Sequence, residues 1–161
     1  MKKWMIISAI SLVLIGIGLS VYAYSIIRAP LNERLASAEA SVLASEELES
    51  ITDISYYHGQ SSFFVAKGFD ADGDAAIAWL LEDGEEPVQV LKESEGISEE
   101  EAVAITESAV NTETIQSVKL GMENNTALYE IKYLTDSDHQ GYYYLTFSDG
   151  SFIKRYSLRT D

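Results

Sequence analysis

The sequence contains no cysteine, so disulfide bonds, thiol catalysis, haem attachment through cysteine and thiolate metal sites are all excluded. An exported domain of this composition must therefore fold on its hydrophobic core alone. Only two histidines are present, His58 and His139, and both stand in polar, turn-like contexts. We expect a solvated loop around each of them, and the sequence predicts no metal ion and no cofactor.

Basic residues are scarce, with 11 lysines and arginines against 26 acidic residues and a formal charge of −15. Three basic residues and no acidic residue precede Pro30, so the rest of the chain holds eight basic and 26 acidic residues and a charge of −18. Such a surface repels phosphate backbones and anionic lipid headgroups. Binding to nucleic acid or to the surface of a lipid bilayer is therefore disfavoured.

Charge is absent altogether from residues 4–27, which are predominantly apolar. A transmembrane helix needs about 20 mostly apolar residues. Lys2 and Lys3 precede the stretch, and the membrane flank richer in Lys and Arg stays inside the cell. The sequence therefore predicts a cytoplasmic tail over residues 1–3, a single transmembrane helix over residues 4–27, and an extracytoplasmic remainder.

A cleaved signal peptide is the competing interpretation of the same stretch. Val21-Tyr22-Ala23 is a small-x-small pattern, which signal peptidases accept, so cleavage after Ala23 is the alternative. However, the apolar run continues through Ile27, and it exceeds the usual signal-peptide core of about 7–15 residues. We therefore favour a retained signal-anchor.

The pattern after the anchor predicts one helix followed by four short strands. Apolar residues at helical spacing predict the helix from about Pro30 to Glu49. Alternating and β-branched runs bounded by turn signals predict the strands. Their ranges are Ile51–Tyr57, Ser62–Phe69, Ala75–Leu81 and Pro87–Leu91.

The same order then repeats. Ser98 and Glu101 form a capping-box pattern that predicts the start of a second helix. The strands predicted after it are Thr114–Met122, Ala127–Leu134, Gly141–Phe147 and Ser151–Tyr156. This duplication predicts an α+β fold with two modules, residues 30–93 and 94–161, each a helix packed on a four-stranded antiparallel sheet.

Two motifs that could carry chemistry have simpler structural explanations. The Asp70–Asp74 run resembles a calcium loop, but its glycine is fourth instead of sixth and position twelve is Leu81, so a hairpin turn explains it. Ser151 and Lys154 match the S-x-x-K motif of penicillin-binding proteins. In a strand, positions i and i+3 point to opposite faces. We therefore predict no catalytic residue and a protein that is not an enzyme.

Two tyrosine-rich runs, one containing Tyr56 and the other Tyr142 and Tyr144, are denser in aromatics than a simple core requires. In a strand, alternate members of each run face outward unless another part of the chain covers them. Exposed tyrosines are enriched at protein–protein contacts. Tyr142, Tyr144, Tyr56 and Trp79 are therefore candidate partner-binding residues, and the alternative is that they fill the space between the two modules.

The order and spacing of several local sequences resemble the bacterial YpmB/TseB family of cell wall elongation regulators. The matching segments are Phe64–Gly68 with Asp70, Gly73 and Trp79; Glu95–Glu99 with Ala102; and Tyr129–Ile131 with Tyr133, Leu134, Tyr143, Leu145, Asp149 and Gly150. The resemblance implies tandem PepSY-like (cystatin-like) domains that face the wall of a Gram-positive bacterium.

This resemblance also implies a non-enzymatic role through association with an elongation-specific class B penicillin-binding protein. Two alternatives stay open. The first is that a PepSY-like module inhibits or modulates a secreted or membrane peptidase, as such modules do in some propeptides. The second, less favoured, is an enzyme that acts on wall glycan.

Overall fold

The structure is a computed structural model, and it describes residues 2–136 and 139–158, without the side chains of residues 2–13, 21 and 23–29. The chain divides into two units, Met1–Ser37 and Ala38–Asp161. The second unit holds all eight strands that the structure describes.

Helix α1 (Lys2–Ala44) runs without interruption through Pro30. The prediction of a separate helix from Pro30 to Glu49 is therefore wrong at both ends. Proline has a φ near the helical value, but inside a helix it removes one backbone hydrogen bond and crowds the preceding turn, so Pro30 is an unfavourable residue at this position. The helix ends early because Glu46 adopts a left-handed conformation with φ of 61°, which helical residues do not share.

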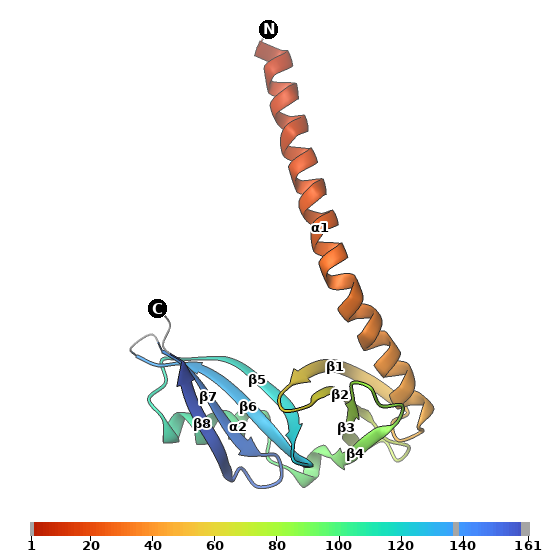
Figure 1. The fold of residues 1–161 in the computed structure, drawn as a ribbon, viewed down its shortest axis with the longest axis vertical. Helices are drawn as coiled ribbons and strands as arrows, with labels where there is room; N and C mark the ends of the chain where they lie inside the picture. The colour runs from red at the N-terminus through yellow and green to blue at the C-terminus, as the bar shows by residue number, and fades with distance from the viewer. Residues whose placement is uncertain (1, 137–138, 159–161) are drawn as a thin grey trace. The chain divides into compact units, whose positions relative to one another are not determined.

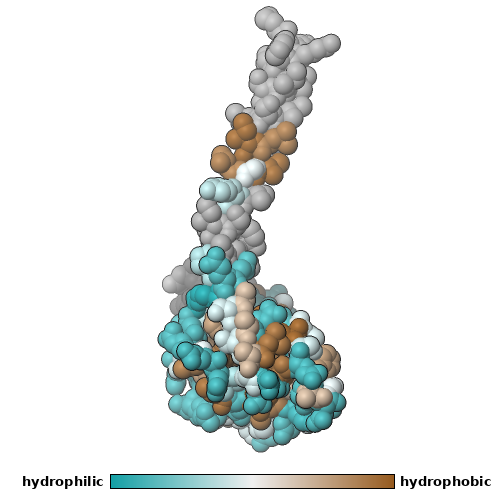
Figure 2. Space-filling model, turned by 90° about the vertical axis from the view of Figure 1, so that its right-hand side faces the viewer, coloured by the Kyte–Doolittle hydropathy of each residue, from teal (hydrophilic) through white to brown (hydrophobic). Residues whose placement is uncertain are grey.

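The first unit carries a group of exposed apolar side chains among the residues whose side chains the structure describes. Leu14, Ile15, Ile17 and Leu19 are all exposed, and they form the brown band between grey residues in Figure 2. Within the described residues, no helix has an apolar stretch of the length that crossing a membrane requires. Most of the predicted span 4–27, including the alternative cleavage point at Ala23, lies outside the described side chains, so the anchor stays a prediction.

Two four-stranded antiparallel sheets make up most of the second unit (Figure 1), as the sequence predicts. Each sheet is a meander in which neighbouring strands are consecutive in the chain. The first sheet contains β1 (Ser50–His58), β2 (Ser62–Phe69), β3 (Ala75–Leu81) and β4 (Pro87–Lys92). The second contains β5 (Thr114–Glu123), β6 (Thr126–Leu134), β7 (Gln140–Thr146) and β8 (Phe152–Leu158).

Two helices follow β4 and precede β5 in the chain: a short 3₁₀ helix η1 (Glu93–Glu95) and helix α2 (Glu99–Ala109). The sequence did not predict η1. Ser98 caps α2 through the predicted capping box: its hydroxyl accepts from the Glu101 backbone N–H, and the Glu101 carboxylate accepts from the Ser98 N–H. Helix α2 packs on the second sheet against β5 and β6. Beside β8, the same face carries the hollow described with the partner-binding surface.

The two sheets share one hydrophobic core. Side chains alternate along each strand, so Val65 and Ile77 point with Trp79 to one face of the first sheet. These three residues belong to one buried cluster with residues of the second sheet, including Leu128 and Phe147. The two modules are therefore joined by a packed interior.

The opposite face of the first sheet is also buried. Its side chains are mostly small, with three alanines among them: Phe64, Ala66, Ala76, Ala78 and Leu80. The end of α1 and the segment after it contribute the buried residues Ala38, Val42 and Leu48. Since an apolar face needs a cover, we infer that residues 38–48 cover this face, and the alanines permit a close approach of the backbone.

Candidate partner-binding surface

Trp79, the first of the predicted partner-binding residues, lies in the junction between the modules with no exposed surface. Its indole Nε1–H donates to the Gly121 carbonyl oxygen at 3.0 Å. Its ring meets the Phe147 ring edge-on, with centroids 5.9 Å apart. Burial of this kind makes Trp79 part of the packing between modules, which was the alternative interpretation, and it offers no contact area to a partner.

Tyr57 fills the neighbouring part of the junction. The Tyr57 ring packs over Gly121 so closely that a Cβ atom at position 121 would lie 2.5 Å from it. The Tyr57 hydroxyl donates to the Glu123 carboxylate at 3.2 Å. Glycine at position 121 is therefore required by the approach of β1 to β5, and strand β1 does contact β5.

Glu123 is a buried carboxylate that joins the junction to the far edge of the second sheet. Its second oxygen accepts from the Lys154 ammonium at 2.5 Å. Lys154 also lies over the Tyr144 ring, 4.5 Å from the centroid. An acidic and a basic group thus meet across the sheet, with Tyr57 as the second hydrogen-bond partner of the carboxylate.

Tyr144, another predicted contact residue, is buried in this network. Its hydroxyl donates to the Glu130 carboxylate at 2.7 Å and lies 2.7 Å from the Tyr156 hydroxyl. Tyr144 is paired with Glu130 on one side and with Lys154 on the other in the strand register. The buried ring stabilises the sheet and leaves little area for a partner.

Burial raises the pKa of three tyrosines in the second unit well above the ordinary value. Desolvation is the largest cause for Tyr57 and Tyr144; the Glu123 carboxylate adds to it for Tyr57, and the hydrogen bonds with Tyr156 and Glu130 add to it for Tyr144. Burial, assisted by the acidic residues of α2 and η1, raises the pKa of Tyr129 to about 12. All three hydroxyls are therefore neutral hydrogen-bonding groups at physiological pH.

Tyr56, the third predicted contact residue, is half-buried on the first sheet. Its hydroxyl donates to the Glu82 carboxylate at 2.8 Å. Its ring packs against Phe64 and stacks with His58, at centroid distances of 5.4 and 6.3 Å. Tyr56 stands on a different sheet from Tyr142, so the four predicted residues do not form one patch.

Tyr142 is the predicted residue that fits an open surface best. It is half-buried, and its ring stacks on Tyr156 with centroids 5.0 Å apart. Lys132, Tyr142 and Tyr156 are register partners across β6, β7 and β8, so their side chains share one face of the sheet. The sequence analysis missed Lys132 and Tyr156, although both lie at the alternating spacing that would place them beside Tyr142.

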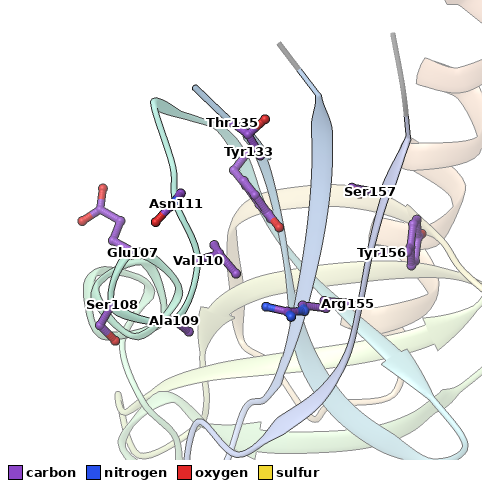
Figure 3. A pocket seen from close by; sticks show the side chains of 10 residues that line it. All are labelled: Glu107, Ser108, Ala109, Val110, Asn111, Tyr133, Thr135, Arg155, Tyr156 and Ser157. Carbon is purple, nitrogen blue, oxygen red and sulfur yellow. The ribbon is translucent and has the colours of Figure 1, made fainter. Parts of the chain in front are cut away.

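A hollow of about 680 Å³ opens on the other face of the same sheet, beside the last turn of α2 (Figure 3). Its lining combines helix and strand residues: Glu107, Ser108, Ala109, Val110, Asn111, Tyr133, Thr135, Arg155, Tyr156 and Ser157. In Figure 3 the Arg155 side chain reaches from β8 toward α2, whereas Tyr156 points the other way. The hollow lies beside the end of α2, whose main contacts with the sheet are made to β5 and β6.

The Asp70–Asp74 run and the S-x-x-K motif both have structural roles. The Asp70 carboxylate accepts from the backbone N–H groups of Asp72 and Asp74, and the Lys92 ammonium pairs with Asp70 and Asp74, so the run forms the hairpin turn between β2 and β3. These hydrogen bonds, chiefly the one from Asp74, lower the pKa of Asp70. Lys154 of the S-x-x-K motif is engaged by Glu123.

The geometry defines a class of protein: two helix-and-sheet modules with a shared core. Residues 96–156, which lie within the second module, match the PepSY family, described as "Peptidase propeptide and YPEB domain". The chain is 26% identical over 149 residues to the probable cell wall elongation regulator TseB of Bacillus subtilis, covering 92% of this chain and 91% of that protein.

A solved structure, the YpmB protein from Bacillus subtilis, matches with a TM-score of 0.71 and 25% identity, covering 76% of this chain and 96% of that one. The resemblance inferred from the sequence, to the YpmB/TseB cell wall elongation regulators with PepSY-like modules, is therefore confirmed. The similar protein TseB is named as a probable regulator, and the matched family is described as a peptidase propeptide domain, which favours a role other than catalysis.

Proposed function

We propose that this protein is a membrane-anchored, extracytoplasmic, non-enzymatic regulator of cell wall elongation that binds a class B penicillin-binding protein. The observation that carries the proposal is the end-to-end similarity to the probable cell wall elongation regulator TseB, which extends over 92% of this chain. Similarity of that extent includes both modules and the segment before them. The role in wall elongation therefore concerns the chain as a whole.

The uncharged stretch 4–27 supports the membrane part of the proposal. The basic residues at the two ends support the orientation, because Lys2 and Lys3 precede the stretch and only Arg28 follows it closely. A tether of this kind would hold the two modules close to membrane-bound enzymes of wall synthesis. Tethering raises the effective concentration of a partner in the same membrane, so even a weak contact would suffice.

The surface around Tyr142 supports the binding part of the proposal. Tyr142 and Tyr156 stack on the face of the second sheet that also carries Lys132. Aromatic side chains with a polar tip are well suited to protein–protein contacts. A partner there would contact the rings and the lysine without disturbing the buried network of Tyr144 and Glu123.

Capture from membranes tests the proposal. The full chain, carrying an affinity tag at its C-terminus, is expressed in a Gram-positive host, crosslinked in intact cells and purified from solubilised membranes. We expect a class B penicillin-binding protein among the captured proteins, above the level obtained with an unrelated single-pass protein carrying the same tag. Capture of no wall-synthesis protein under several crosslinking conditions would contradict the proposal.

The second candidate function is inhibition or modulation of a secreted or membrane peptidase, which the description of the matched family as a peptidase propeptide domain favours. The purified full chain, assayed against candidate peptidases, separates the two functions. Inhibition of a peptidase together with absence of a wall-synthesis partner would favour the second candidate.

A further inference from the structure

Strand β8 is an edge strand of the second sheet, and several of its apolar side chains are exposed. Among the described residues it pairs with β7 alone, so one side of its backbone has no strand neighbour. Among the described side chains outside α1, six large apolar ones are exposed, and four of them belong to β8: Phe152, Ile153, Tyr156 and Leu158. An exposed, apolar edge strand is a template for pairing with another chain.

The other three edges lack this character. Neither β1 nor β5 carries an exposed large apolar side chain, and β4 carries one, Val88. Edge strands in natural proteins are usually protected by charges, bulges or short length. Strand β8 carries two charged residues and a register irregularity in its pairing with β7, yet it exposes Phe152 at 56%, Tyr156 at 45% and Leu158 at 54%, so its exposed side chains are the most apolar of the four edges.

The hollow beside β8 provides a place for a side chain of an added strand. It lies on the α2 face, between Val110 at the end of the helix and Arg155 and Ser157 of β8. Side chains of an added strand would alternate between this face and the face of Tyr156. In strand addition, main-chain hydrogen bonds give affinity, and pockets for alternate side chains give specificity.

Charge identifies the kind of segment that fits. Residues 38–158 contain six lysines and arginines, of which Lys67, Lys92 and Lys154 form ion pairs with carboxylates. No ion pair among the described residues includes Lys119, Lys132 or Arg155, and all three belong to the second sheet. Arg155 lines the hollow together with Glu107 and forms no ion pair among the described residues, so a carboxylate that enters beside it can pair with its guanidinium.

We infer that β8 accepts an extended, acidic segment of a partner protein as a fifth strand of the second sheet, with a carboxylate of that segment entering the hollow beside Arg155. The inference rests on the proposed function, since it names the surface through which a protein partner would bind. A second copy of this chain fits less well. Pairing two β8 strands would bring Lys154 and Arg155 of one copy close to the same cations of the other.

The test uses the full chain in lipid nanodiscs and two synthetic seven-residue peptides with blocked ends, Thr-Glu-Val-Glu-Val-Glu-Thr and its counterpart with lysine in place of glutamate. Affinities are measured by calorimetry, and the bound strand is located by NMR through contacts between peptide and β8 amides. We expect the acidic peptide to bind at least about tenfold more tightly than the basic one. We also expect peptide contacts to β8 and not to β1, β4 or β5.

Two charge-reversal variants separate a local ion pair from the overall charge. Arg155→Glu should remove or reverse the preference for the acidic peptide. Lys119→Glu is the matched control, because it changes the net charge equally at an exposed position on the opposite edge strand. It should leave the preference nearly unchanged. Equal effects of both variants, equal affinity for both peptides, absence of binding, or peptide contacts on another edge would overturn the inference.

Self-pairing has its own signature: β8 amide shifts that depend on protein concentration without peptide would show a second copy at this edge and would also overturn the inference. The proposed function fails separately. If the acidic peptide binds β8 but no wall-synthesis protein is captured from membranes, the function is wrong and the surface stands. If a penicillin-binding protein is captured equally by wild type and Arg155→Glu, the function stands and the surface is wrong.

Discussion

Trp79 donates its indole N–H to the Gly121 carbonyl oxygen at 3.0 Å, and this hydrogen bond joins residues 42 positions apart in two different sheets. Both groups are inaccessible to water, so each depends on the other as a partner. The same tryptophan packs edge-on against Phe147. These contacts belong to the core that both sheets share, so substitutions there should affect both modules together.

Trp79→Phe should weaken this junction. The substitution removes the indole donor, leaves the Gly121 carbonyl oxygen unpaired and creates a small cavity, so we expect a loss of about 2–4 kcal/mol in the free energy of unfolding. Urea denaturation of the full chain in detergent, followed by circular dichroism, measures the loss. Phe69→Leu at an exposed position is the control and should change stability little. Equal stability of the two variants would show that the hydrogen bond contributes nothing.

Gly121→Ala should also be destabilising, because the new methyl group would lie 2.5 Å from the Tyr57 ring. Overpacking of this kind typically costs about 1–3 kcal/mol. A double-mutant cycle with Tyr57→Leu identifies the cause. The smaller side chain should recover part of the loss in the Gly121→Ala background, whereas additive effects would mean that the glycine is required for another reason.

Lys154→Met should leave the Glu123 carboxylate buried with Tyr57 as its remaining partner among the interactions described above. Since Glu123 is buried and Lys154 is partly exposed, we expect a loss of about 1–3 kcal/mol. Lys119→Met removes an exposed lysine from the same sheet and should stay within about 0.5 kcal/mol of wild type. Thermal unfolding measures the loss of stability in each variant. Equal losses for Lys154→Met and Lys119→Met would contradict a stabilising role of the Glu123–Lys154 pair.

Alkaline pH should destabilise the fold through its buried tyrosines. The pKa of Tyr129 is raised by burial from 10.0 to about 12, so the folded state holds the proton more tightly than the unfolded state. The stabilisation is complete below pH 10 and is lost as the pH rises toward 12. Absorbance titration of the phenolates at 295 nm, together with stability measured across this range, checks the sign.

Tyr129→Phe provides the control for that titration, because it removes one late-titrating group and with it part of the pH dependence above pH 10. The Tyr129 hydroxyl also donates to the Ile97 carbonyl oxygen, so the variant should be less stable at neutral pH. An unchanged slope between pH 10 and 12 would contradict the assignment.

The sequence predicted the sheets well because their signals are local. Strands β2 and β3 have the predicted bounds, and Ser98 caps α2 as its capping box indicates. Asn124 and Asn125 join β5 to β6, and both adopt the positive φ that tight hairpin turns need, which asparagine tolerates. These features depend on neighbouring residues and on periodicity.

The candidate site was harder to predict because exposure depends on contacts between distant segments. Tyr142 and Tyr144 have the same alternation in the sequence, yet Tyr144 is buried through Glu130 and Lys154 whereas Tyr142 keeps part of its ring accessible. Trp79 is likewise buried between the two sheets, where β5 packs against β1 and β2. No local pattern distinguishes these cases, and the end of α1 at Ala44 depended on a single left-handed residue.

The central claim, that this protein acts by binding a class B penicillin-binding protein, is tested most directly by site-specific photo-crosslinking in growing cells. A photoreactive phenylalanine analogue replaces Tyr142 on the second sheet, or Asp53 on the exposed edge of the first sheet as the control. The account predicts a covalent adduct with a class B penicillin-binding protein from position 142 and little or none from position 53. Adducts that contain no wall-synthesis protein at either position, in cells where the protein is present at its normal level, would contradict it.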